Sequence, residues 1–180
     1  MIKNIVIEES ISKDLLVVDE YEFEDIAAEF INCEEYMNLS LESHHGTQRL
    51  KHSFKVAKGT YIIAKSLGLD YKSATRAAFL HDFFFNDNFP EDIKSIKRSK
   101  EHPKQALLNS QKYFNINEKE ADAILNHMYP LTPTRPKTLE GTTLSLVDKG
   151  VAIQEYILSL GTRKTKNTIN QLNKKLIKSR

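Results

Sequence analysis

Apolar residues recur at intervals of three and four along most of this 180-residue chain. This spacing places them on one face of an α-helix and so predicts amphipathic helices. A strand pattern appears only in the sequence IVIEE at 5–9. The expected fold is therefore all-α, a single domain built as a helical bundle. The segments that show the helical stripe are 21–31, 47–67, 71–82, 102–114, 118–128 and 140–158.

Glycine, proline and short polar residues mark the expected ends of these helices. Gly68 predicts a C-cap, because glycine adopts the left-handed conformation without strain. Asp70 and Asn117 predict N-caps, since their side chains accept hydrogen bonds from free backbone N–H groups. Pro103 is tolerated in a first helical turn, so we expect a helix to begin there, after a loop or short helix over 86–100.

The charges of the chain are separated along it, although 26 Lys and Arg against 24 Asp and Glu leave a net charge of only +2. Residues 1–42 hold twelve acids and two bases, so this segment carries −10 and the remainder +12. We expect 1–42 to be an acidic helical segment with a solvated surface. Attraction between this segment and the basic remainder of another copy is compatible with a homodimer.

The C-terminal segment 161–180 is strongly basic, with seven bases and no acids after Thr162. We interpret it as a basic helix or tail, and we expect it to dock because a weak apolar stripe there needs cover. Nucleic-acid binding by the tail is an alternative that we favour less. The remaining residues, 43–160, would form the core of the domain.

Composition excludes several classes of protein. Cys33 is the only cysteine, which rules out a disulfide framework and a thiolate zinc cage. No apolar run approaches the ~20 residues of a membrane-spanning helix, and the first residues do not show the pattern of a signal peptide, so we expect none. We therefore expect a cytoplasmic protein with no membrane partner.

Ionisable residues lie on the apolar faces of five predicted helical segments. A single inward histidine is usually an ordinary core residue, but five such segments form a pattern. Burying these groups is costly unless they are paired or bind a metal. Imidazole and carboxylate suit a divalent transition metal such as Mn, Fe, Co, Ni or Zn. The residues are His52, His81 with the adjacent Asp82, His102, His127 and Asp148.

Three stretches of this sequence resemble the HD-domain phosphohydrolases, which are named for an adjacent His-Asp pair. They are LKHSFKVA at 50–57, AAFLHDFFF at 77–85 and LSLVDKGVA at 144–152. With His102 and His127, the order H…HD…H…H…D is similar to that of the subgroup that binds two metals. The resemblance implies that His52, His81, Asp82 and Asp148 hold one ion. Asp82 would bridge to a second ion, held also by His102 and His127.

Subfamilies of the HD-domain phosphohydrolases differ in short motifs, which indicate the subfamilies that this sequence resembles. The Glu-Asp pair of guanosine tetraphosphate hydrolases is missing from FFFNDN, the six residues directly after Asp82, and no GYP triplet follows His127. His127, the fifth residue in the order H…HD…H…H…D, is a single histidine, and in this the chain resembles the symmetrical diadenosine tetraphosphate hydrolases. The motifs HHG at 44–46 and HMYP at 127–130 resemble a group of small bacterial HD proteins.

The resemblance implies a metal-dependent phosphohydrolase, in which a metal-activated hydroxide attacks a phosphoester or phosphoanhydride. The expected substrate is a nucleotide or another small phosphorylated molecule. As catalytic residues we predict Asp82, His45 as proton donor to the leaving group, and Lys149. Arg49, Lys149 and Arg135 would bind substrate. The alternative is a nucleotide-sensing module that keeps the metal site but turns over little substrate.

Overall fold

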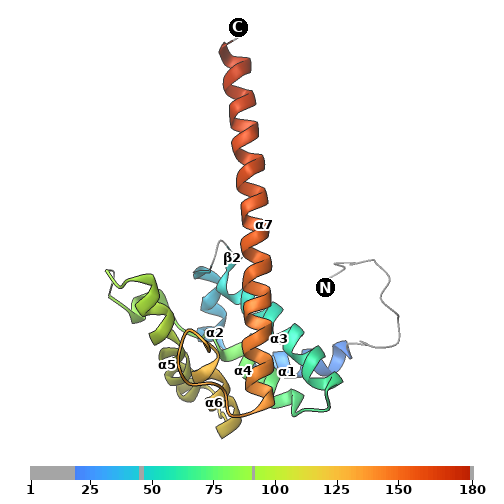
Figure 1. Cartoon of the computed structure of the whole chain (residues 1–180). Helices are drawn as coiled ribbons and strands as arrows, with labels where there is room; N and C mark the ends of the chain where they lie inside the picture. The colour runs from blue at the N-terminus through green and yellow to red at the C-terminus, as the bar shows by residue number, and fades with distance from the viewer. Residues whose placement is uncertain (1–18, 45–46, 91, 179–180) are drawn as a thin grey trace.

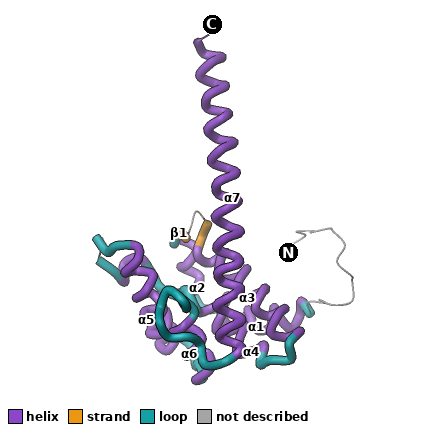
Figure 2. Tube along the Cα trace, in the orientation of Figure 1, coloured by secondary structure: helices purple, strands orange, loops and turns teal. Residues whose placement is uncertain are grey.

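The structure is a computed structural model that describes residues 19–44, 47–90 and 92–178, with the side chains of 43, 44, 47, 95 and 162–178 left out. Apart from loops and turns, the described part is helical, with one antiparallel pair of two-residue strands (Figures 1 and 2). The all-α, single-domain prediction is confirmed, whereas the stretch at 5–9 lies outside the described residues. The elements are α1 Glu20–Ile31, α2 Glu34–Met37, η1 Asn38–Leu41, β1 Ser43–His44, β2 Thr47–Gln48, α3 Arg49–Ser66, α4 Tyr71–Leu80, η2 Asn86–Asn88, α5 Ser95–Tyr113, α6 Glu118–Asn126 and α7 Leu139–Lys178.

Helix α4 lies at the centre of the domain and packs against α3, α6 and α7. Its alanines Ala74, Ala77 and Ala78 are at most 1% exposed. Because alanine is small, the neighbouring helices can approach the α4 backbone closely. The end of this central helix is therefore surrounded by other helices, and His81 and Asp82 follow it directly.

An aromatic cluster joins the first helices to this core. Phe30 of α1 stacks on Phe79 of α4 with ring centroids 4.6 Å apart. Tyr36 of α2 is fully buried, and its hydroxyl donates to the Phe79 carbonyl at 2.8 Å. Helices α1 and α2 thus pack on the same core as α4, and the proposed boundary at residue 42 stays a prediction.

Three of the predicted helix ends are confirmed. Gly68 follows α3 with a φ of 66°. Asp70 accepts from the backbone N–H of Ser73 at 3.1 Å, and Asn117 forms a capping box with Glu120. These caps satisfy N–H groups that would otherwise lack partners in the first turns of α4 and α6.

The start of α5 differs from the prediction. The helix begins at Ser95 rather than near Pro103, which lies in its interior. Proline removes one backbone hydrogen bond there, but Ala106 and Ser110 of the following turns are fully buried. Tertiary packing therefore outweighs the local cost of the proline, and His102 lies in the middle of the helix.

The C-terminal segment continues α7 instead of forming a separate docked helix. Helix α7 has 40 residues, and its second half projects away from the other helices (Figure 1). No proline follows Pro136 in the sequence, so nothing in the chain interrupts the helix before Lys178. The expected docking of 161–180 is therefore not observed for 161–178, the part that the structure describes, and the division of the chain at residue 160 stays a prediction.

Candidate metal centre

Six ionisable side chains from five helical segments converge at the centre of the bundle. All are buried, with at most 8% of each residue exposed. The structure thus brings together every residue that the sequence suggested as a metal ligand. They are His52 on α3, His81 and Asp82 directly after α4, His102 on α5, His127 directly after α6, and Asp148 on α7.

His81 and His127 occupy the same position relative to their helices. Each is the C-cap residue, and each Nδ1 lies within hydrogen-bonding distance of the carbonyl three residues earlier: 2.7 Å to Ala78 and 2.8 Å to Ile124. A carbonyl oxygen only accepts, so Nδ1 must carry the proton. The helix ends therefore fix both rings with Nε2 directed toward the cluster.

His52 and His102 show the same arrangement with different acceptors. His102 Nδ1 lies 3.3 Å from the Arg98 carbonyl, and its Nε2 lies 3.2 Å from Asp82 Oδ1. His52 Nδ1 lies 3.0 Å from the Glu155 carboxylate, and its Nε2 lies 3.1 Å from Asp148 Oδ1. All four imidazoles thus use Nδ1 for orientation and direct Nε2 toward the carboxylates or toward one another.

The potential ligand atoms form two overlapping groups. One consists of His52, His81 and Asp148, and the other of His81, Asp82 and His127, with the atoms of each group within 4.8 Å of one another. The two Asp82 oxygens face different histidines: Oδ1 lies 3.2 Å from His102 Nε2, and Oδ2 lies 3.9 Å from His81 Nε2. A carboxylate in this position can contact two cations at once.

The surroundings of the cluster shift the pKa values of two of its histidines in opposite directions. Burial lowers the pKa of His127, and the neighbouring His102 and His81 lower it further, to about 3. Burial also opposes charge on His81, but Asp82 and Asp148 outweigh it and raise the pKa of His81 to about 9. The pKa of Asp148 lies well below its usual value, because contacts with His52 and His81 outweigh its burial. The cluster therefore keeps Asp148 charged and attracts positive charge.

The donor set fits a divalent transition metal. His81 Nε2 is fully buried but makes no well-formed hydrogen bond within the described part of the chain; the facing carboxylate oxygens lie 3.5 Å away on Asp148 and 3.9 Å away on Asp82. A buried nitrogen of this kind needs an explanation, and a metal ion supplies one. Four imidazole nitrogens and two carboxylates match Mn, Fe, Co, Ni or Zn, while Mg and Ca prefer oxygen ligands.

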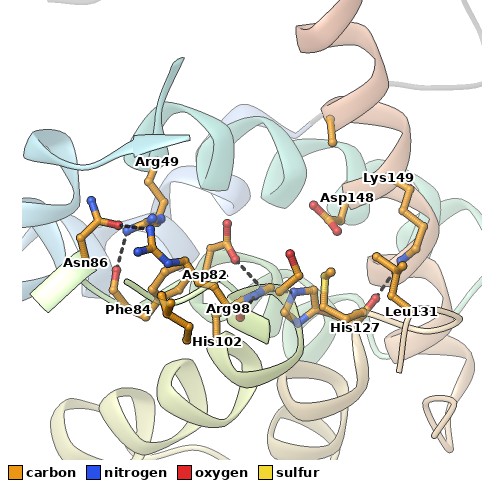
Figure 3. Close-up of a pocket in the computed structure, with 14 residues that line it drawn as sticks. Arg49, Asp82, Phe84, Asn86, Arg98, His102, His127, Leu131, Asp148 and Lys149 are labelled. Carbon is orange, nitrogen blue, oxygen red and sulfur yellow. Dashed lines mark hydrogen bonds and ion pairs between the residues drawn. The ribbon is translucent and has the colours of Figure 1, made fainter. Parts of the chain in front are cut away.

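A cavity of about 490 Å³ opens onto the cluster (Figure 3). Asp82, His102, His127 and Asp148 line it, so a molecule in the cavity would contact four of the six candidate ligands. The volume lies within the usual range for small-molecule sites, about 300–1,000 Å³.

The predicted substrate-binding cations differ in their position relative to this cavity. Arg49 lines the cavity; its Nη1 donates to the Phe84 carbonyl at 2.7 Å and to Glu42 at 3.1 Å. Lys149 also lines it, but its ammonium donates to the His127 carbonyl and to both oxygens of Ser145 at 2.8–3.1 Å. These bonds occupy all three protons of Lys149, so its predicted contact with substrate would require rearrangement.

The two remaining predicted residues are Arg135 and His45. Arg135 lines a neighbouring cavity of about 460 Å³, which shares Lys149 with the first. His45, the predicted proton donor, lies outside the described residues. The catalytic and substrate-binding roles of these side chains stay predictions.

Two residues of the site were missed in the sequence analysis. Arg98 lines the cavity and lies four residues before His102, one helical turn away on the same face. Glu155 contacts His52 and lies seven residues after Asp148, two turns along the same face of α7. Helical spacing from the predicted ligands could have indicated both positions, although not the groups that they contact.

Comparison with known proteins agrees with this site. The HD domain family model matches residues 49–152, more than half of the chain, and all six candidate ligands lie within that range. The chain therefore belongs to the HD domain family, whose members are typically metal-dependent phosphohydrolases.

Distant relatives are found among curated proteins. The chain is 30% identical over 110 residues to ribonuclease Y from two strains of Ureaplasma parvum serovar 3. The match covers 61% of this chain but only 21% of each relative, so the chain spans about a fifth of their length. No solved structure gives a significant match. None of the described helices is long and apolar enough to cross a membrane.

Proposed function

We propose that this protein is a metal-dependent phosphohydrolase with a dinuclear centre that acts on a nucleotide or a related small phosphorylated molecule. The observation that carries the proposal is the convergence of four Nε2 atoms and two carboxylates in one buried cluster, four of whose six residues line a cavity. His52, His81 and Asp148 would hold the first ion. His102 and His127 would hold the second, and Asp82 would bridge the two.

The bound ions would supply Lewis acidity and a nucleophilic hydroxide at neutral pH, by lowering the pKa of water. The chain itself contributes rigid placement. His81 and His127 are fixed by helix-end carbonyls, and Asp82 is 2% exposed at the centre of the site. Because these groups are already oriented, little reorganisation would be needed when substrate binds.

The surroundings of the cluster support an anionic substrate. Arg49 and Arg98 line the same cavity, and each lowers the free energy of a phosphate placed there. Arg135 and Lys149 line the adjoining cavity. They would contact any part of the substrate that extends out of the cavity lined by Arg49 and Arg98. His45 would protonate the leaving group. The name of the ribonuclease Y relatives denotes cleavage of RNA, which is consistent with a phosphoester substrate for this chain too.

A panel of phosphorylated compounds tests the proposed function. Protein loaded with Mn, Fe, Co, Ni or Zn should release phosphate or nucleotide from at least one of a set of nucleoside mono-, di- and triphosphates, dinucleoside polyphosphates and short RNA. Asp82→Asn should abolish this activity, whereas Asp25→Asn, the same change at an exposed position of α1, should not. Tight nucleotide binding without turnover of any compound would favour the nucleotide-sensing alternative and refute the proposed phosphohydrolase activity.

A further inference from the structure

Glu155 is a buried carboxylate that the proposed chemistry does not use. It lies on α7 and is 2% exposed. One oxygen accepts from His52 Nδ1 at 3.0 Å, and the other accepts from Lys55 Nζ at 2.7 Å. His52 and Lys55 belong to α3, so this carboxylate connects the two helices that contribute His52 and Asp148 to the cluster.

The partner of His52 differs in kind from those of the other three histidines. His81, His102 and His127 each present Nδ1 to a backbone carbonyl of their own helix. His52 presents Nδ1 to a side chain 103 residues away in the sequence. Its orientation is therefore set by a tertiary contact rather than by its own helix, and it depends on Glu155.

Glu155 is held on its other side by Lys55, which forms an ion pair with it at 2.7 Å. Lys55 keeps its ammonium near solvent, with 47% of its side chain exposed, while it reaches the buried carboxylate. An ionised carboxylate on Nδ1 holds the proton there and makes the opposite nitrogen a better electron-pair donor.

We propose that Glu155 is a positioning residue for metal binding, which holds His52 in the Nδ1-protonated form with Nε2 directed at the first ion. The inference rests on the proposed metal-dependent function and deepens it. Lys55 holds Glu155 from the solvent side. The result is a continuous contact from Lys55 through Glu155 and His52 to Asp148, across the packing of α3 against α7.

Metal titration of the full chain tests the inference without depending on turnover. Isothermal titration calorimetry with Zn²⁺ and Co²⁺ would compare wild type with Glu155→Ala and Glu155→Gln. The glutamine variant removes the charge of the side chain but keeps its size. Glu155→Ala should weaken binding of the first ion by about 10–100-fold, the usual cost of losing such a partner. Glu155→Gln should weaken it less, because the amide oxygen can still accept from His52. The Co²⁺ absorption spectrum should change in both variants, since His52 is a ligand.

Glu140→Ala is the matched control. Glu140 is also on α7, is 9% exposed and pairs with a lysine, Lys119, at 3.2 Å, but it contacts Asp70 rather than a histidine. This change should lower the melting temperature and leave the metal affinity and the Co²⁺ spectrum unchanged. A purely structural role for Glu155 would give the same result as this control.

The outcomes separate the two proposals. Wild type that binds metal, with both Glu155 variants binding equally tightly and giving the same Co²⁺ spectrum, would overturn the positioning role alone. Wild type that binds no metal would overturn the metal-dependent function, and the positioning role with it.

Discussion

His102 Nε2 lies 3.0 Å from His127 Nε2, while the Nδ1 atoms of both rings face backbone carbonyls. If both Nδ1 atoms carry protons, the facing nitrogens present lone pairs to each other, which is unfavourable in a buried site. A proton or a cation between the rings relieves this repulsion. Burial and the nearby histidines lower the pKa of His127 to about 3, which argues against a second proton, on Nε2, in addition to the one on Nδ1. A metal ion shared by the two rings would be the second ion of the proposed centre.

Replacing His127 should empty one metal position. In His127→Ala, the remaining His102 and Asp82 offer too few protein ligands for tight binding, so the metal content should fall from two ions to one. His52, His81 and Asp148 are unaffected by the change and should retain the first ion. Elemental analysis of the purified variant, after equilibration with excess metal and gel filtration, measures the content. A variant that still holds two ions would contradict the assignment of His127.

Removing the Asp82 carboxylate should have a larger effect than removing any single histidine. Asp82 faces His102 with one oxygen and His81 with the other, so Asp82→Asn removes a charge shared by both positions. We expect both ions to be lost and hydrolysis to fall to the background rate. Asp25→Asn, on the exposed side of α1, should keep the wild-type metal content. Retention of both ions by Asp82→Asn would show that the residue does not bridge them.

Gly59 sets the distance between α3 and α7 near the cluster. A Cβ atom at this position would lie 2.8 Å from Cγ1 of Val147, which directly precedes Asp148. Valine is stiff at χ1 and cannot easily move aside, so Gly59→Ala should lower the free energy of unfolding by about 1–3 kcal/mol. Urea denaturation measures this quantity.

Gly150→Ala is the matched control for this prediction. It makes the same change within α7, where a Cβ would meet nothing within 4 Å. Because alanine has the higher helix propensity, this variant should be more stable by about 0.5–1 kcal/mol. Equal effects of the two substitutions would contradict the close packing at Gly59.

The contribution of Glu22 to the stability of the fold should be lost at acidic pH. Hydrogen bonds from Lys65, Tyr71 and Tyr61 lower the pKa of Glu22 from 4.5 to about 2. A carboxyl with a lowered pKa in the folded state stabilises it fully above the unfolded value, and this contribution is lost as the pH falls toward about 2. Glu22→Gln should therefore melt at a lower temperature than wild type at pH 7, and the two should converge on acidification.

Glu24→Gln is the control for the acid dependence, because Glu24 is exposed on the same helix. This variant should melt at the wild-type temperature at every pH between 7 and 2. A constant difference between Glu22→Gln and wild type from pH 7 to pH 2 would mean that the charge of Glu22 does not carry the effect.

The metal-site candidates could be predicted because each depends mainly on local spacing. His52 and Asp148 share faces with apolar neighbours on α3 and α7, and the cap residues Asp70 and Asn117 locate the starts of α4 and α6. Once those helices pack with their apolar faces inward, the ionisable residues on these faces must meet.

Other features depend on contacts that spacing does not encode. The pairing of Glu155 with His52 joins residues 103 positions apart. The bond of Lys149 to the His127 carbonyl depends on how α6 meets α7. The start of α5 at Ser95 depends on packing that compensates for Pro103. Each of these is a property of the packed helices rather than of any one segment.

Metal content is the most direct measure of whether the buried cluster is a dinuclear centre. Wild-type protein saturated with Mn²⁺, Co²⁺ or Zn²⁺ would be analysed for bound metal and crystallised for anomalous diffraction. We predict two ions per chain, one beside His52, His81 and Asp148 and one beside His102 and His127, with Asp82 between them. A single ion per chain would contradict the dinuclear centre, and no metal at the cluster would contradict the metal-dependent function itself.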